Sequence, residues 1–348
     1  MSLDVRPAAL AAPFRPRGPL SEAVLARLTG QPGQPGDAGL AALADRALTE
    51  TVDVVRDDDV QLALFALFAS SYGSFDQFEA DLEWDGELIG ARRQLEADFE
   101  QALRAAVQVP ALPTSTTDAV ARALFALTAQ EGGPSLSRYL AKRATREQVL
   151  ELLVQRSVYT LREADPHSWA IPRLHGRAKA ALVEIQADEY GGGRPDRVHA
   201  AIFAASMRGA GLDDSYGSYV DVVPALTLAS HNMMSMFGLN RRLIGAIVGH
   251  LAAFEMTSSI PNRLYGDGFR RLGFGEDVTD YFDEHVEADA VHEQIAAHDL
   301  AGALAEDRPD LLPDIMFGAA ACVTIDGWVA QQMLDAWHDG GTSLRVPV

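Results

Sequence analysis

The chain reads His285-Val286-Glu287-Ala288-Asp289-Ala290-Val291-His292, and this stretch is the most informative about fold and chemistry. On an α-helix, which turns by about 100° per residue, His285, Asp289 and His292 share a stripe about 60° wide. The small and apolar residues between them indicate a helix packed inside a bundle, where three polar side chains are costly unless a metal or mutual hydrogen bonds satisfy them. Taken alone, the stretch supports a metal site and a solvated polar face about equally.

Helical periodicity extends outward from this segment over most of the chain. From Asp37 onward, apolar residues recur at three- and four-residue spacings, Ala and Leu are abundant, and β-branched alternation is rare. Thr145, followed by Glu147 and Gln148, has the composition of a helix N-cap. We therefore predict an all-α protein.

Proline and glycine suggest three regions. Residues 1–36 are rich in Pro, Gly and Ala, and we expect them to form a mobile or surface-bound arm. Soft boundaries near Pro113 and Pro134 delimit an N-terminal helical region, 37–144, from a helical core, 145–340. The two regions could also pack as one body.

Composition restricts the class of partner. The 348 residues are 48% hydrophobic, enough for a large core, and 49 acidic against 29 basic side chains give a net charge of -20. This charge repels phosphate backbones and anionic lipid, so we expect neither nucleic acid nor a membrane as partner. No basic segment precedes an apolar one near the N-terminus, and the expected location is cytoplasmic.

Cysteine content restricts the chemistry. The single cysteine, Cys322, lies in an apolar run and can form neither an internal disulfide nor a thiolate cluster, and we expect it in the core. Redox chemistry in this chain would therefore need a metal or a cofactor.

Further ligand candidates lie upstream of the His/Asp/His stripe. Glu255 lies in an apolar helix without a charged neighbour three or four residues away, so its ionised carboxylate needs a cation. Glu189 and His199 flank Gly191-Gly192-Gly193, which favours a local distortion of the backbone around them. Each of these two residues, taken singly, is more often a surface residue.

Another helix contributes Glu163, which could equally be an ion-pair partner of Arg162 or Arg156. Helices that each supply Glu or His build carboxylate-bridged dimetal sites, and nitrogen and oxygen ligands without sulfur favour iron or manganese. The ferritin-type Glu-x-x-His pair does not occur in the sequence, which favours a different helical scaffold.

These motifs resemble the haem-oxygenase-like diiron oxidases and oxygenases, also described as iron-containing redox enzymes. The resemblance rests on the stripe from His285 to His292, on Glu255 thirty residues before it and on Glu189-x9-His199, and it covers roughly residues 155 to 300. It implies a haem-oxygenase-like seven-helix bundle, without haem, preceded by the N-terminal helical region.

The resemblance also implies a ligand set. Glu163, His199 and His292 would surround one iron, and Glu255, His285 and Asp289 would surround or bridge to the other. Glu189 matches an additional carboxylate that only part of the family carries, associated with N-oxygenating members.

The implied activity is O2-dependent, with two Fe ions as cofactor, O2 as co-substrate, an external electron donor and a homodimeric assembly. We expect N-oxygenation of an amine or of an amino-acid-derived small molecule. Oxidative C–C cleavage, desaturation and a non-catalytic iron-binding protein remain alternatives. Arg173 and Arg263 lie near the ligands in sequence and are candidates for binding a substrate carboxylate, although an ordinary salt bridge is the commoner role.

Overall fold

The computed structural model describes residues 13–31, 39–129 and 135–347, and within these ranges every regular element is a helix. The all-α prediction is confirmed. The side chains of residues 287–290 lie outside the described part, although their backbone is helical. The chain forms two compact units, Met1–Leu103 and Arg104–Val348, which are described separately.

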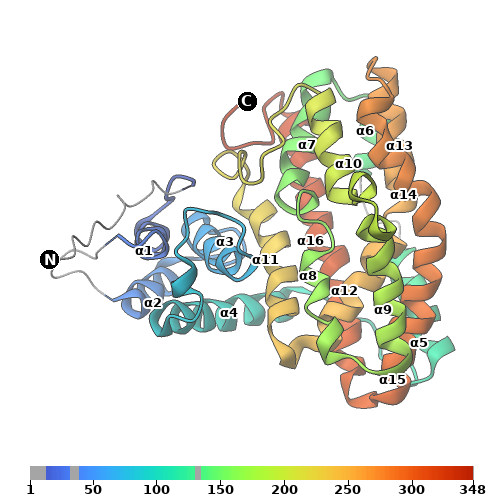
Figure 1. Ribbon diagram of the computed structural model, residues 1–348, viewed down its shortest axis with the longest axis horizontal. Coiled ribbons are helices and arrows are strands. Elements are labelled where there is room, and N and C mark those ends of the chain that lie inside the picture. Colours follow the sequence, from blue (N-terminus) through green and yellow to red (C-terminus); the bar gives the residue numbers. More distant parts are fainter. Residues whose placement is uncertain (1–12, 32–38, 130–134, 348) are drawn as a thin grey trace, which may run out of the picture. The chain divides into compact units, whose positions relative to one another are not determined.

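The first unit is built around one buried helix. Its elements are α1 (Pro19–Leu28), α2 (Leu40–Glu50), α3 (Asp58–Tyr72), η1 (Ala80–Leu82) and most of α4 (Gly86–Ala106), coloured blue to teal in Figure 1. Residues 60–69 of α3 are all buried, and α1 and α2 pack against this helix. Phe14, Phe65, Phe75 and Phe78 form an aromatic cluster beside α3.

Helix α1 lies within residues 1–36, which were predicted as a mobile or surface-bound arm. Its apolar residues Leu20, Val24, Leu25 and Leu28 are buried, and Asp59 of α3 accepts hydrogen bonds from the backbone of its first turn. In the sequence, the prolines around α1 hide the helical spacing of these apolar residues. Residues 1–12 and 32–38 of the same predicted arm lie outside the described residues.

The second unit holds the remaining helices, which Figure 1 shows in green to red. In chain order these are α5 (Thr117–Thr128), α6 (Leu136–Lys142), α7 (Arg146–Thr160), α8 (Asp165–Ser168), η2 (Ile171–Arg173), α9 (Gly176–Glu189), η3 (Gly191–Gly193), η4 (Pro195–Arg197), α10 (His199–Gly209), α11 (Ala225–Leu239), η5 (Arg241–Leu243), α12 (Ile244–Met256), α13 (Ser259–Arg271), α14 (Glu276–Gln294), η6 (Ile295–Gly302), α15 (Ala303–Asp307), η7 (Pro309–Leu311) and α16 (Leu312–His338).

Helix α7 begins as its sequence predicts. The Thr145 hydroxyl accepts from the Gln148 amide, and the Gln148 side chain accepts in return from the Thr145 amide at 3.0 Å. This reciprocal pair satisfies amides of the first turn that have no partner within the helix.

The unit boundary differs from the limit expected near residue 144. It falls inside α4, so α5 and α6 belong to the second unit, where α5 packs against η6 and α6 against α13. Leu124 and Leu140 are fully buried in these contacts. Pro113, one of the signals used to place the boundary, therefore lies within a compact unit.

Helices α12 and α16 make the most extensive helix pair of the second unit, and glycine allows their backbones to approach closely. A Cβ atom on Gly249 would overlap the Ile315 carbonyl, and one on Gly318 would overlap the Ala246 carbonyl. By length and composition, the helical stretch Pro309–His338, most of it α16, could cross a membrane, as could the bent pair Arg241–Met256 and Ser259–Arg271. Buried core helices share these properties, and Cys322 of α16 is buried as expected.

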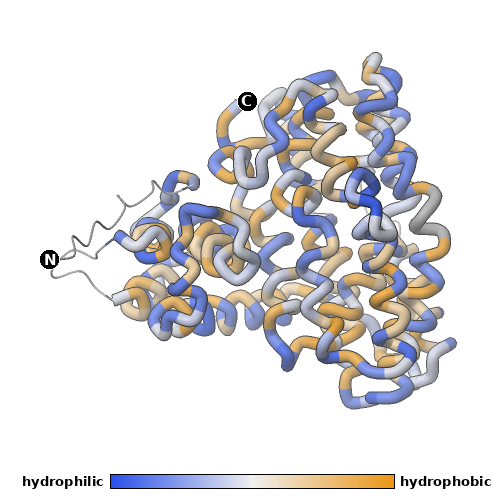
Figure 2. Tube along the Cα trace, viewed as in Figure 1, coloured by the Kyte–Doolittle hydropathy of each residue, from blue (hydrophilic) through white to orange (hydrophobic). Residues whose placement is uncertain are grey.

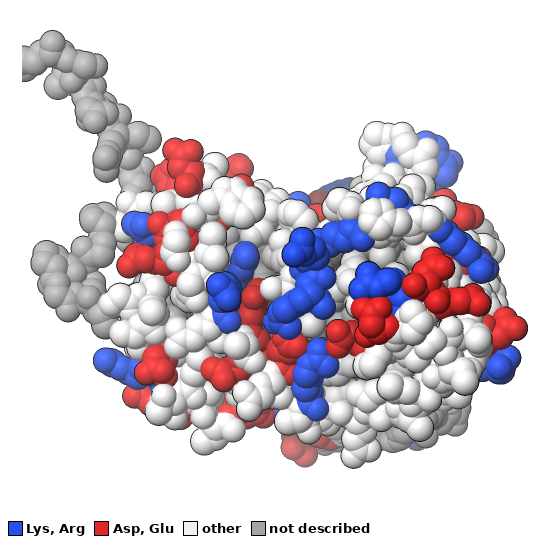
Figure 3. Space-filling view, turned by 90° about the horizontal axis from the view of Figure 1, so that it is seen from below, with Lys and Arg blue, Asp and Glu red and all other residues white. Residues whose placement is uncertain are grey.

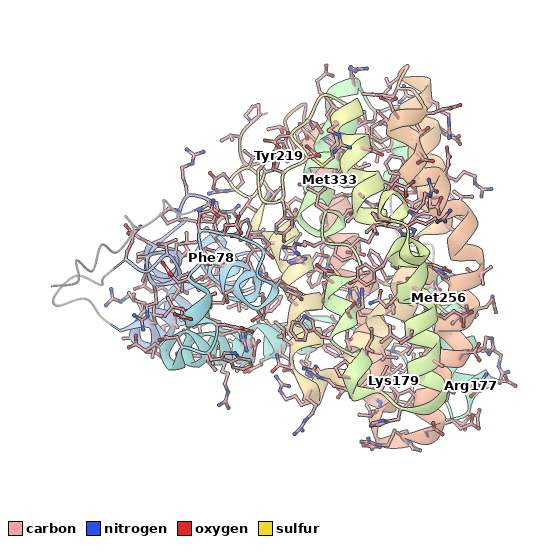
Figure 4. All side chains as sticks on the ribbon, in the orientation of Figure 1. Phe78, Arg177, Lys179, Tyr219, Met256 and Met333 are labelled. Carbon is pink, nitrogen blue, oxygen red and sulfur yellow. The ribbon has the colours of Figure 1, made fainter. Side chains whose placement is uncertain are left out.

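The surface of the chain mixes both signs of charge. Hydrophobic and hydrophilic stretches alternate along the helices (Figure 2), and acidic and basic side chains are intermingled on the face shown in Figure 3. Arg177, labelled in Figure 4, donates from Nε to Asp299 at 2.8 Å. The acidic excess is thus partly compensated by local pairing.

Because α12 packs closely on α16, adding one methyl group at their contact should destabilise the protein, whereas adding one elsewhere on α16 should not. Gly249→Ala is expected to destabilise the protein by about 2 kcal/mol, because the added atom forces the two backbones apart. The matched control is Gly327→Ala, since a Cβ there meets nothing within 4 Å. It should be neutral or stabilise by up to about 1 kcal/mol. Urea unfolding of both variants measures the difference, and equal stabilities would contradict the packing argument.

Candidate metal centre

A strained turn after α7 positions Glu163. Ala164 adopts a left-handed conformation with φ of 72°, which is unfavourable for a residue with a Cβ. Its amide donates to the Tyr159 hydroxyl at 3.3 Å, and its carbonyl accepts from the Gln186 side chain at 3.0 Å. These contacts stabilise the turn. Helix α7 therefore ends here, and the Glu163 side chain is buried in the bundle.

The glycine run brings Glu189 and His199 together. Gly191, Gly192 and Gly193 have φ of 72°, 59° and 82°, so the chain reverses sharply between α9 and α10. A Cβ on Gly191 would also clash with the backbone that follows. The expected distortion is confirmed: His199 Nδ1 lies 3.0 Å from Glu189 Oε2, and both side chains are buried.

Helix α14 contributes His285 in a fixed orientation. Its Nδ1 donates to the Tyr281 carbonyl at 2.8 Å, which fixes the ring so that Nε2 lies 3.5 Å from Glu163 Oε1. The Tyr281 hydroxyl lies 2.8 and 2.9 Å from the two Glu163 oxygens. The ring centres of His199 and His285 are 4.5 Å apart.

His292 faces a different carboxylate. Its Nδ1 lies 3.4 Å from Oε2 of Glu255, in the last turn of α12, and its Nε2 lies 3.1 Å from Asp188 Oδ2. Glu255 is buried, whereas most of the Asp188 side chain is exposed. Asp188 therefore orients the ring from the solvent side.

The side chains form two possible ligand groups that share one residue. Within each group the ligand atoms lie within 4.8 Å of one another, and every member is buried. Glu189 belongs to both groups. The members are Glu163, Glu189, His199 and His285 in the first group and Glu189, Glu255 and His292 in the second.

The contacts within these groups fit a bound metal. Ligand atoms about 2.1 Å from one ion, at angles of about 90° to 110°, are separated by about 3.0 to 3.4 Å. The His199 and His292 pairs with carboxylate oxygens fall at 3.0 and 3.4 Å. Yet Nδ1 of each ring is buried without a hydrogen-bond partner in the described part of the chain. Nitrogen and oxygen donors without sulfur suit iron or manganese.

The electrostatics of the groups also favour a cation. Burial, reinforced by the nearby Glu189, raises the pKa of Glu255. Burial alone would lower the pKa of His292, but Glu255 and Asp188 outweigh it and raise that pKa to about 9. The pKa of His199 rises for the same reason, because Glu189 outweighs burial. The buried carboxylates thus create a negative potential that a metal ion can neutralise.

The structure brings together the predicted ligands except Asp289, whose side chain lies outside the described residues. The grouping differs from the one implied by the family resemblance. His285, not His292, lies with Glu163 and His199, and His292 lies with Glu255. Seven residues of helix separate the two histidines by about 10 Å along its axis, so they meet different partners.

The model of one protein family, iron-containing redox enzyme, matches residues 150–327, just over half of the chain. The chain belongs to this family of iron-containing redox enzymes. The matched range contains both ligand groups, and the all-α bundle is haem-oxygenase-like, as predicted.

Among solved structures, the chain is similar to a CADD-like protein of unknown function from Nostoc punctiforme. The TM-score is 0.48 at 16% sequence identity, over 60% of this chain and 93% of that chain. No curated protein sequence matches the chain.

A cavity of about 290 Å³ lies beside the ligand groups of this iron-containing redox enzyme. It is partly open to solvent and is lined by residues of α6, α7, α11, α12, α13 and α16, among them Met333, labelled in Figure 4. Tyr159, Phe254 and Ser258 line both this cavity and the small space among Glu163, Glu189 and Glu255. The cavity and the space among the ligands are therefore adjacent and share these side chains.

The two arginines expected to bind substrate do not line this cavity. Arg173 donates to the carbonyls of Gly238 and Leu239, the latter at 2.9 Å, and Arg263 is exposed on α13. Arg156 lines the cavity instead. In the sequence, Arg156 could have been noticed because it lies seven residues before Glu163 in the same expected helix.

Metal binding should release protons. At pH 7, below the pKa of about 9, His292 of the metal-free protein holds a proton that a metal must displace. Mn2+ affinity should therefore rise with pH between about 6.5 and 8. Titration calorimetry in buffers of different ionisation enthalpy counts the protons released, and pH-independent binding would contradict this account.

Proposed function

We propose that this chain is a diiron oxidoreductase that uses O2 as co-substrate. The observation that carries the proposal is that Glu189 belongs to both ligand groups, since a shared carboxylate is how helical bundles hold two metal ions close together. When bound, two irons would supply electrons and open coordination positions for O2.

The protein side chains have separable roles in this proposal. The Tyr281 hydroxyl, hydrogen-bonded to both oxygens, holds the Glu163 carboxylate, and the Tyr281 carbonyl fixes the tautomer of His285. Behind the ligands, His167 and His250 are hydrogen-bonded at 3.1 Å, and burial lowers the pKa of His167 to about 3 and that of His250 well below its ordinary value. This neutral pair adds no positive charge near the metal centre.

We propose N-oxygenation as the reaction. An amine, O2, two electrons and two protons would give a hydroxylamine and water, with the electrons supplied by an external donor. The proposal rests on Glu189, which matches a carboxylate associated with N-oxygenating members of the family and which here is buried between the two ligand groups.

The shared carboxylate predicts how iron binding should respond to single substitutions. Wild-type protein loaded anaerobically with Fe(II) should retain about two irons per chain, His292→Ala about one, and Glu189→Ala none, because only Glu189 serves both groups. Glu184→Ala is the control, since Glu184 is exposed on the same helix, α9. Elemental analysis after desalting gives the counts. Two irons retained by Glu189→Ala would contradict the shared site.

Isotope labelling separates N-oxygenation from the other reactions. With 18O2, an external reductant and a panel of primary amines and amino acids, N-oxygenation adds one labelled oxygen to nitrogen. Desaturation would remove two hydrogens without label, and C–C cleavage would shorten the carbon chain. Mass spectrometry distinguishes these products. Iron binding without substrate-dependent O2 uptake would identify a non-catalytic iron protein.

A further inference from the structure

The cavity beside the ligand groups contains one cationic and one anionic side chain that do not pair with each other. Arg156 of α7 and Asp326 of α16 both line it. Within the described part of the chain, no carboxylate lies within ion-pairing distance of Arg156. Opposite charges that face one cavity but remain apart are an arrangement that a ligand carrying both signs can complete.

Asp326 offers a carboxylate to the cavity. Its Oδ1 accepts from the Ser230 hydroxyl at 3.2 Å, and the side chain keeps accessible surface although protein surrounds it. Burial raises its pKa to about 6, against the opposing effects of Ser230 and Arg156. The group is therefore mainly ionised at neutral pH, and no cationic side chain of the described ranges is in direct contact with it.

Arg156 offers the opposite charge. Its guanidinium carbon lies 5.7 Å from the Tyr265 ring centre and 5.9 Å from that of Tyr281, and its Nε is buried without a hydrogen-bond partner among the described residues. An anion in the cavity would give this donor a partner. The aromatic rings hold the guanidinium in place, so little side-chain freedom is lost when an anion binds.

A third group indicates that the ligand also donates hydrogen bonds. Asn262, one turn before Tyr265 on α13, lines the same cavity and is 1% exposed. Its Oδ1 has no hydrogen-bond partner in the described part of the chain. Buried amide oxygens are rarely left unsatisfied, because this costs about 1 to 3 kcal/mol. Water could satisfy the amide, but it supplies no charge for Arg156 or Asp326.

We propose that the cavity binds a small zwitterion, with its ammonium group at Asp326 and Asn262 and its carboxylate at Arg156. The substrate of the metal centre would then be an amino acid or a close analogue, and the nitrogen that N-oxygenation modifies would be one in its side chain, because the ammonium paired with Asp326 has no lone pair to accept oxygen. This inference rests on the proposed function only in taking the bound molecule to be the one that is oxidised.

The size and lining of the cavity fit such a ligand. A volume of about 290 Å³ is enough for a single amino acid. Met234, Val329 and Met333 add apolar surface for an aliphatic tail. Tyr159, Phe254 and Ser258 line both this cavity and the space among the metal ligands, so the bound molecule lies next to the metal centre.

Three probes that share one n-butyl chain test the inference. L-norleucine carries both charges, pentylamine lacks the carboxylate, and hexanoate lacks the amine. Calorimetric titration of the full-length, iron-loaded protein without O2 should show that norleucine binds at least about ten-fold more tightly than either analogue. Equal affinity for the three probes, or no binding of norleucine, would overturn the inference. This comparison needs no variant.

Two variants assign the charges. Asp326→Asn should abolish the preference for norleucine over hexanoate, and Arg156→Gln should abolish the preference over pentylamine. Asp335→Asn, an exposed carboxylate on the same helix, α16, should leave both preferences intact. Thermal unfolding verifies that each variant is folded. Wild-type preferences in Asp326→Asn and Arg156→Gln would overturn the assignment.

The binding result separates this inference from the proposed function. Zwitterion-selective binding in a protein that takes up no O2 would support the cavity assignment and overturn the oxidase proposal. O2 uptake without zwitterion selectivity would overturn the cavity assignment and support the oxidase.

Discussion

The buried carboxylate of Glu189 lies within reach of ligands from four other segments of the chain, and the rest of the site is arranged around it. Together with Glu163 and Glu255 it concentrates negative charge in a helical bundle, where an unpaired ion is strongly destabilising. Protons on His199 and His292 relieve part of this cost in the metal-free protein, as their raised pKa values indicate. Metal ions relieve it more completely, because one cation neutralises several carboxylates at once.

Local backbone features that end or redirect helices hold this cluster of charged side chains in place. Three left-handed glycines fold α10 back onto the end of α9, and left-handed Ala164 directs Glu163 inward. The close contact of α12 with α16, made possible by Gly249, fixes the helix whose last turn carries Glu255. A π-helical segment, η6, follows α14 directly after the two histidines, a feature common near functional sites.

Much of the site could be predicted because its residues violate ordinary burial rules. Glu255 is an acid in an apolar helix without a local counter-charge, which favoured a cation, whereas the stripe of His285 and His292 fitted a metal site and a solvated face equally well until the other ligand candidates were added. The grouping of ligands could not be predicted, because it depends on which helices face α14 at each level. Arg156, Tyr281 and Asp326 gave no pattern of their own, since their roles arise from tertiary contacts. Likewise, α1 was hidden because its short apolar stripe lies among prolines.

X-ray absorption spectroscopy of the Fe(II)-loaded protein tests the paired site most directly. We expect an iron–iron scattering path at about 3.5 to 4 Å, typical of two-metal sites, in the wild type and its loss in His292→Ala. Iron bound with nitrogen and oxygen neighbours but without any iron–iron path in the fully loaded wild type would contradict a shared Glu189 site.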